Sequence, residues 1–263
     1  MSRTFEVNEL YAGYDKQIIL KDINLSVLMN KISVILGSNG SGKSTLLKAM
    51  ARLILPEKGA IKLDGKAIHE LPTKKLAQKI GLLPQSPLVP EGITVADLVS
   101  RGRFPYQSMF KGLTNEDYNI IAEALELVGI SDLAERNVDE LSGGQRQRVW
   151  IAMALVQQTD ILLLDEPTTF LDVAYQVEIL DTLTELNKKK NITIIMVLHD
   201  VNLSARYADY IFAIKDGSLI AEGSSKHVIT EENISRIYGL DSLVIEDPYS
   251  KTPMVIPKGR NII

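Results

Sequence analysis

The amino-acid sequence predicts an α/β fold with a mostly parallel sheet, an antiparallel β subdomain at the N-terminus and an inserted, mostly helical subdomain. Three observations lead to this prediction. Short apolar runs rich in β-branched residues alternate with stretches of helical spacing, as in 31–36 and 45–55. Residues 5–28 have the pattern of antiparallel strands. Between about 87 and 141 the chain changes to helical segments joined by polar turns, after which the strand and helix alternation resumes.

One domain accounts for all 263 residues. We expect residues 1–86 and 155–240 to form a core with the β subdomain and residues 87–154 to form the helical subdomain. Residues 241–263 are a Pro-punctuated C-terminal extension to which the sequence assigns no role. With 45% hydrophobic residues the chain can bury a substantial core unaided. Its lack of cysteine excludes disulfides and thiolate metal sites.

The local pattern justifies each element in turn. The pattern predicts antiparallel strands within 5–28, a strand over 31–36, and a helix over 45–55 that ends before Pro56. Asp-Gly pairs at 64–65 and at 216–217 predict two hairpins, because both turn residues can take positive φ. The remaining predictions are helices over 95–101, 116–128 and 146–158 and strands over 161–164 and 192–198.

The segment Gly37 to Ser44 reads GSNGSGKS and lies between a predicted strand and a predicted helix. Its glycines let successive backbone N–H groups line an anion-sized cradle that fits a triphosphate. We expect Lys43 to contact the β and γ phosphates and Ser44 to ligate Mg²⁺, as in phosphate-loop NTPases. A glycine-rich turn without this role is the alternative, but the flanking strand and helix argue against it. The predicted loop comprises Gly37, Ser38, Asn39, Gly40, Ser41, Gly42, Lys43, Ser44 and Thr45.

Two adjacent acids, Asp165 and Glu166, follow the apolar run ILLL at 161–164. A continuous apolar run suits a strand buried on both faces of a parallel sheet, whose carboxyl edge is where phosphates bind. We expect Asp165 to hold Mg²⁺ and Glu166 to polarise the attacking water as general base. Two solvated acids at a strand end are the alternative for this pair seen alone.

A second glycine-rich segment, LSGGQ, occupies Leu141 to Gln145. Its structural interpretation is a capping box, with Ser142 as N-cap and Gln145 reaching back. Its functional interpretation is a second anion site, because Gly143 and Gly144 expose bare N–H groups in the first turn of the helix. Both can hold. Since one chain already has a complete phosphate cradle, we expect this second site to close over the γ-phosphate held by a partner subunit.

These segments carry a family resemblance. GSNGSGKST, LSGGQRQR, ILLLDEP and His199 occur in the order seen in ATP-binding cassette (ABC) ATPases, and the resemblance covers nearly the whole chain. Ser38 and Ser41 depart from the commonest residues at two variable positions of the loop, which leaves nucleotide binding in place. The resemblance implies ATP and Mg²⁺ as cofactors, ATP hydrolysis coupled to transport, and a homodimer in the ATP-bound state.

The resemblance also implies roles for four further residues. Tyr14 would stack on adenine, although Tyr11 is a nearby rival and either ring could simply pack in a hairpin. Gln85 would sense Mg²⁺ and the permease and help catalysis, with an ordinary polar loop residue as the alternative. Asp172 would lie in the loop that crosses the dimer. His199 would contact the γ-phosphate, with a simple strand-end cap as the alternative.

A narrower resemblance lies in the segments RGRFPY at 101–106, TTFLDVAYQVEIL at 168–180 and MVLHDVNLSARYAD at 196–209. They are similar to the importer ATPases for ferric siderophores, haem and cobalamin, the siderophore members most closely. This resemblance implies a peripheral subunit on the cytoplasmic face of the cell membrane. It would power an integral permease and serve an extracytoplasmic binding protein indirectly. The cargo rests wholly on this resemblance, with haem or cobalamin as alternatives.

Bulk properties limit the other function classes. The net charge is −4, so there is no global basic footprint for nucleic acid, and the run Lys188 to Lys190 suits a solvated helix end. No stretch reaches the roughly 18 apolar residues of a membrane span, so we expect membrane contact to pass through a partner. A soluble ABC ATPase acting on DNA or ribosomes would carry coiled-coil insertions or tandem cassettes, which are missing here. A non-hydrolysing scaffold is disfavoured by the presence of Glu166 and His199.

Overall fold

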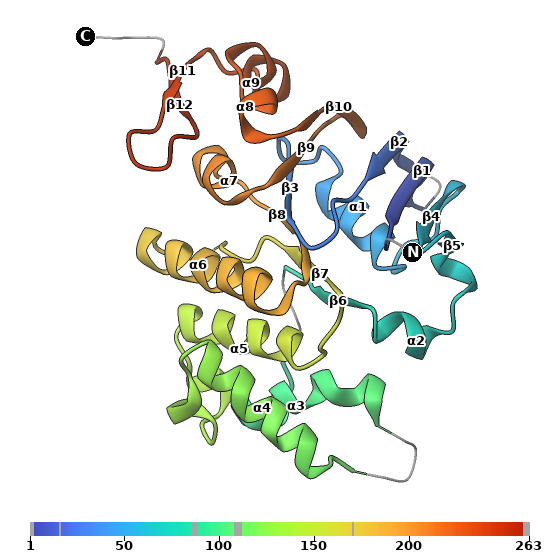
Figure 1. The fold of residues 1–263 in the computed structure, drawn as a ribbon, viewed down its shortest axis with the longest axis vertical. Helices are drawn as coiled ribbons and strands as arrows, with labels where there is room; N and C mark the ends of the chain where they lie inside the picture. Colours follow the sequence, from blue (N-terminus) through green and yellow to red (C-terminus); the bar gives the residue numbers. More distant parts are fainter. Residues whose placement is uncertain (1–2, 16, 86–88, 108–111, 170, 260–263) are drawn as a thin grey trace. The chain divides into compact units, whose positions relative to one another are not determined.

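A computed structural model describes residues 3–15, 17–85, 89–107, 112–169 and 171–259 (Figure 1). The chain forms two compact units. The first comprises Met1–Leu71 and Thr193–Ile263, and the second comprises Pro72–Ile192. The division into a core, a helical subdomain and a C-terminal extension stays a prediction. Some residues of the predicted segments lie outside the described residues: Pro87, two positions after Gln85, residue 170 of the segment 168–180, and the last four residues of the C-terminal extension.

The first unit begins with an antiparallel sheet whose strands lie in the order β2, β1, β4, β5. Alternate residues of β1 and β2 face inward and are buried, including Leu10, Leu20 and Ile23, because every second side chain of a strand points to the same face. The predicted N-terminal β subdomain is therefore confirmed. The strands are β1 at Phe5–Tyr14, β2 at Gln17–Ser26, β4 at Lys58–Leu63 and β5 at Lys66–Ala67, and a 3₁₀ turn follows at Ile68–Glu70.

The same unit contains parallel strands around β3. This strand, Ile32–Leu36, pairs in parallel with β8 (Thr193–Val197) on one side and β9 (Tyr210–Lys215) on the other. Every residue of β3 and β8 is buried, as expected for strands covered on both faces. Strand β10 (Ser218–Gly223) adds an antiparallel edge. The unit's helices are α1 at Lys43–Met50, α7 at Val201–Tyr207, α8 at Ser225–Val228 and α9 at Glu231–Tyr238.

The second unit pairs β6 (Ile80–Leu83) with β7 (Ile161–Asp165) in parallel, and β7 is fully buried. Most of its remaining residues are helical. The helices are α2 at Thr73–Ala77, α3 at Val95–Ser100, α4 at Asn115–Leu127, α5 at Gly143–Leu155 and α6 at Val173–Lys190, with 3₁₀ turns at Arg101–Tyr106, Ser131–Leu133 and Val138–Glu140. Parallel strands in both units and an antiparallel N-terminal sheet confirm the α/β fold class. Within the described ranges, no helix is both long enough and apolar enough to cross a bilayer.

Both Asp-Gly hairpins are confirmed. Asp64 and Gly65 have φ of 53° and 75°, and Asp216 and Gly217 have φ of 50° and 82°, so both residues of each turn adopt the left-handed conformation. Helix α1, however, ends at Met50 rather than at residue 55. The chain leaves the helix at Arg52, which has φ 60°, and the Arg52 guanidinium donates to the carbonyls of Ile68 and Leu71. These bonds across the fold override the helical pattern.

The C-terminal extension contains a hairpin that the sequence pattern did not predict. Strands β11 (Ser242–Glu246) and β12 (Pro253–Pro257) pair antiparallel in continuous register. Prolines at both ends of β12 make the segment unlike an ordinary strand. Its pairing depends on contacts with residues far away in the sequence, which are described below.

Candidate functional site

The predicted phosphate loop lies between β3 and α1, as the motif requires. Gly40 and Gly42 have φ of 76° and 103°, and Gly42 is the N-cap of α1. A Cβ on Gly37 would lie 2.3 Å from the carbonyl oxygen of Ile214, so a side chain there would collide with backbone. The loop is therefore shaped by glycine at positions where other residues would be strained or would clash.

The Lys43 ammonium lies across the loop. Its Nζ donates to the carbonyl oxygens of Gly37 and Ser38, each at 2.9 Å, and the residue is buried. The loop thus holds a positive charge at the position where the motif predicts the β and γ phosphates. Ser44 is half-buried, Thr45 is buried and Asn39 is exposed.

His199 and Tyr14 also belong to the first unit. His199 is exposed and follows directly on Leu198, at the carboxyl end of β8. The next residue, Asp200, is the N-cap of α7 and accepts from the Leu203 N–H at 2.8 Å. Tyr14 ends β1 with 43% of its surface exposed, whereas Tyr11 is half-buried with the Lys58 ammonium 5.2 Å from its ring centre. Tyr14 is therefore the more accessible of the two rings.

The second unit brings Gln85 and Glu166 together, although 81 residues separate them. Gln85 Nε2 donates to Glu166 Oε2 at 2.6 Å, and Thr169 Oγ1 donates to the same oxygen at 3.0 Å. Glu166 has φ 55°, a left-handed conformation that is uncommon outside glycine and that clusters at functional sites. Asp165, the last residue of β7, is buried. Sequence reasoning did not select Thr169. The available signal was its position in DEPTT, three residues after Glu166.

The capping box at Ser142 is confirmed. Gln145 N–H donates to Ser142 Oγ at 3.3 Å, and Ser142 N–H donates to Gln145 Oε1 at 3.1 Å. Gly143 and Gly144 form the first turn of α5. No described atom lies within 4 Å of a Cβ built on Gly143, while on Gly144 the nearest is the Tyr175 ring at 3.7 Å. The capping box thus bonds the N–H groups of Ser142 and Gln145, while the space beside Gly143 is open.

Helix α5 is fastened to α6 by residues that sequence reasoning did not select. The Arg148 guanidinium pairs with Glu178 at 2.5 Å and lies 5.6 Å from the centre of the Tyr175 ring. Asp172 caps α6 by accepting from the Tyr175 N–H at 3.0 Å. The Asp172 segment and the Gly144 turn are therefore neighbours within one unit.

The segment RGRFPY has a structural role in the second unit. Arg103 Nε pairs with Asp117 Oδ1 at 2.7 Å, Arg103 Nη1 donates to the Val156 carbonyl, and both charged residues are buried. The backbone N–H of Thr114 and the Arg103 guanidinium hold the pKa of Asp117 below its usual range. Breaking one half of such a buried pair leaves the other charge uncompensated. Arg103 is therefore a packing residue that holds the start of α4 to the end of α5.

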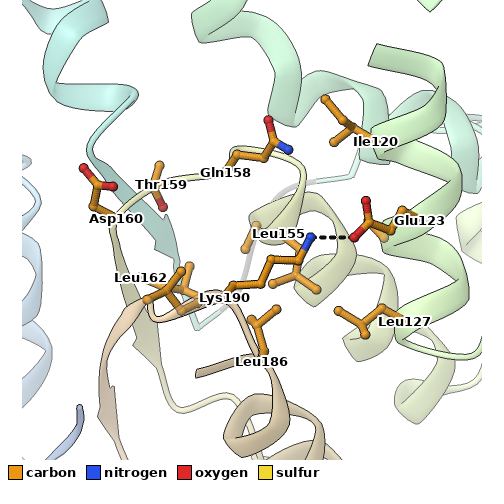
Figure 2. Close-up of a pocket in the computed structure, with 13 residues that line it drawn as sticks. Ile120, Glu123, Leu127, Leu155, Gln158, Thr159, Asp160, Leu162, Leu186 and Lys190 are labelled. Carbon is orange, nitrogen blue, oxygen red and sulfur yellow. Dashed lines mark hydrogen bonds and ion pairs between the residues drawn. The ribbon is translucent and has the colours of Figure 1, made fainter. Parts of the chain in front are cut away.

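A cavity of about 220 Å³ lies among α4, α5, β7 and α6 (Figure 2). Its walls combine apolar residues such as Leu127, Leu155 and Leu186 with polar ones, including the Glu123–Lys190 ion pair. Of the described residues that line it, none is a predicted site residue. The cavity is thus separate from the candidate site.

The comparisons with known proteins identify the class. The ABC transporter family model matches residues 20–169, more than half of the chain. The chain therefore belongs to the ATP-binding cassette ATPases of ABC transporters.

Particular relatives refine this class. The achromobactin transport ATP-binding protein CbrD of Dickeya dadantii is 49% identical over 252 residues, which are 96% of this chain and 94% of the relative. The iron(3+)-hydroxamate import ATP-binding protein FhuC of Bacillus subtilis is 47% identical over 253 residues, again 96% and 94%.

Two solved structures agree. An ABC transporter assigned to the metal-chelate type, in an inward-facing conformation, has a TM-score of 0.86 at 28% identity and covers 99% of both chains. The dimeric bacterial ABC transporter cassette MJ0796 has a TM-score of 0.74 at 30% identity over 84% of this chain and 98% of the other.

Proposed function

We propose that this chain is the ATP-hydrolysing subunit of an importer that takes up a metal chelate, specifically a ferric siderophore, through a separate membrane permease. The observation that carries the proposal is the near-complete alignment, at 47–49% identity, with ATP-binding proteins named for achromobactin transport and iron(3+)-hydroxamate import. The chain's own site residues supply the chemistry that such a subunit needs.

ATP binding is assigned to the phosphate loop. The amides of residues 37–45 and the Lys43 ammonium supply donors and positive charge for the triphosphate, while Tyr14 offers its exposed ring to adenine. Ser44, Asp165 and Gln85 offer the oxygen ligands that Mg²⁺ prefers, and a buried carboxylate such as Asp165 favours a nearby cation. When bound, Mg²⁺ would neutralise negative charge on the phosphates.

Hydrolysis is assigned to Glu166, which would orient and polarise water in line with the γ-phosphate. Its Oε2 accepts from Gln85 and Thr169, so two hydrogen bonds orient its carboxylate. Gln85 would move with the permease and thereby couple transport to this carboxylate. His199 would contact the γ-phosphate, and Lys43 would neutralise charge as it develops.

The active form is proposed to be a homodimer. The first helical turn at Gly143 and Gly144 suits a phosphate, and the loop at residues 37–45 already provides for the chain's own nucleotide. Two chains arranged head to tail would place each Ser142 turn over the partner's ATP, with Asp172 near the interface. The related cassette MJ0796 is dimeric. The subunit would work at the cytoplasmic face of the membrane, attached to its permease and served indirectly by an extracytoplasmic binding protein.

The chemistry is tested with Glu166→Gln. We expect ATP binding to persist, turnover to fall by about 10² to 10⁴, and a stable ATP-dependent dimer to form, because general-base catalysis is lost while the binding groups remain. Phosphate release and analytical ultracentrifugation measure these effects. Glu185→Gln, an exposed Glu to Gln change on α6, is the matched control. Undiminished turnover would remove Glu166 from its role, and a variant that stayed monomeric in saturating ATP would remove the dimer.

The cargo is tested by identifying the permease that co-purifies with the chain and by growth on ferric siderophores as the iron source. Loss of growth on these chelates in cells carrying Glu166→Gln, but not Glu185→Gln, supports the assignment. Co-purification with a permease for sugars or lipids would overturn the siderophore assignment and leave the ATPase assignment intact.

A further inference from the structure

The β11–β12 hairpin lies against α7, the helix that follows His199 (Figure 1). Strand register pairs Val244 with Val255. Val255 is buried, and β12, to which it belongs, contacts α7. The hairpin is therefore packed against α7 within the first unit.

Asn202 of α7 binds the hairpin through both ends of its amide. The Val255 N–H donates to Asn202 Oδ1 at 2.7 Å, and Asn202 Nδ2 donates to the Val255 carbonyl at 3.2 Å. The side chain thus satisfies both backbone groups of one β12 residue, as a neighbouring strand would. A bond pair of this kind specifies both the distance and the direction between α7 and β12.

Arg206 makes a second attachment. It lies four residues after Asn202, and therefore on the same face of α7. Its Nη2 donates to Asp247 Oδ2 at 2.8 Å. Asp247 Oδ1 in turn accepts from the N–H groups of Tyr249 and Ser250 at 2.8 and 3.1 Å. The Arg206 guanidinium and these N–H groups hold the pKa of Asp247 well below its usual range. The turn of the hairpin is thus fastened to α7 by a charged pair.

Helix α7 connects the residues that bind the hairpin to His199. Asp200, next to His199, caps the helix, and the Ser204 hydroxyl donates to the Asp200 carbonyl at 2.6 Å. A helix held at Asn202 and Arg206 therefore restrains the backbone of the residue that precedes its cap. Burial raises the pKa of Tyr238 in α9 to about 12, with opposing effects from the Gly37 backbone and the Asp200 charge.

We propose that residues 242–257 are a positioning element for His199 and act through Asn202 and Arg206. This inference rests on the proposed function, in which His199 contacts the γ-phosphate. Asn202 and Arg206 act through α7 and are positioning residues. The C-terminal extension, to which the sequence assigned no role, would then set the position of the His199 side chain at the reaction centre. Misplacement of such a group by about 1 Å can cost on the order of 100-fold in rate.

The test is a double-mutant cycle between Asn202→Ala and His199→Ala. We expect Asn202→Ala to lower kcat by about 10-fold to 100-fold with little change in the ATP dissociation constant, because the phosphate loop is untouched. In the His199→Ala background the same change should lower kcat no further, since two residues that act as a unit are not additive. Arg206→Gln should behave in the same way with a smaller effect. Lys258→Ala, which removes the exposed Lys258–Asp241 pair at the open end of the same hairpin, is the control.

Two results overturn the inference while the proposed function stands: wild-type kcat in Asn202→Ala, or an additive loss in the double variant. Wild-type kcat in His199→Ala would instead refute the role of His199 and the inference with it. Asn202→Gln, which keeps both the acceptor and the donor of the amide on a longer side chain, covers the case in which Asn202→Ala fails to fold. We expect it to show a smaller kcat defect that is again absent in the His199→Ala background, and an additive loss would count against the inference.

Discussion

The two glycine-rich turns of this chain use glycine for different physical reasons. In the phosphate loop, Gly40 and Gly42 adopt left-handed backbone conformations, and a Cβ on Gly42 would lie 2.8 Å from Leu20 Cδ2. In the LSGGQ turn, Gly143 and Gly144 are in the first turn of an ordinary α-helix. The first pair is needed for the shape of the backbone, whereas the second pair keeps side chains away from a helix N-terminus.

Because of this difference, substitutions in the two turns should affect the stability of the fold and the function of the protein to different extents. At a position that only glycine can occupy without strain, a substitution should lower both the stability of the fold and the affinity for the ligand. A glycine in a helix with open space around it should matter to function alone, because alanine at that position would favour the helix more than glycine does. The two turns therefore form an internal control for each other.

The largest expected effect is at Gly42. Gly42→Ala places a Cβ at φ 103° and against Leu20, which should cost about 1–3 kcal/mol in the free energy of unfolding and displace the loop amides. We expect ATPase activity to fall on the order of 100-fold. Thermal unfolding and ATP turnover measure both effects. Gly40→Ala meets no described atom within 4 Å and should show the backbone strain without the collision. Equal stability of Gly42→Ala and wild type would refute this account of the loop.

An effect on turnover without one on folding is expected at Gly143. Gly143→Ala should leave the chain as stable or raise its unfolding free energy by up to about 1 kcal/mol, because alanine favours the helix. The methyl group would stand over the bare N–H groups, so we expect turnover to fall by about 10². ATP binding to the isolated chain should be unchanged, which equilibrium binding can verify. If turnover stayed normal, the turn would be a cap and nothing more.

The smallest effect is expected from removing the cap. Ser142→Ala should cost about 1 kcal/mol of stability, because the Gln145 N–H loses its acceptor. Thr114→Ala at the start of α4 is a matched control, since Thr114 and Asp117 form the same type of capping box. We expect both variants to lose similar stability in urea unfolding and Ser142→Ala alone to lose turnover. Equal turnover in the two variants would leave Ser142 with a structural role only.

Much of the fold was predictable because its signals are local. Buried strands such as β3 and β7 are runs of apolar residues, and the two Asp-Gly turns carry their own backbone preference. The end of α1 was not predictable, because Arg52 bonds to carbonyls 16 and 19 residues away. The β11–β12 hairpin was missed for the same reason, since Asn202 contacts Val255 across 53 residues.

The sequence by itself determined the chemistry available to this protein: a glycine-rich loop with a lysine and a serine, adjacent acids after a buried strand, and a capped helix with two glycines in its first turn. Each depends on residue type and short spacing, which backbone geometry and side-chain chemistry translate directly into local structure. Only the tertiary structure decided that Gln85 contacts Glu166 and that the C-terminal hairpin binds to the helix after His199. Such contacts join residues far apart in the chain, and their partners are selected by packing, which no local pattern encodes.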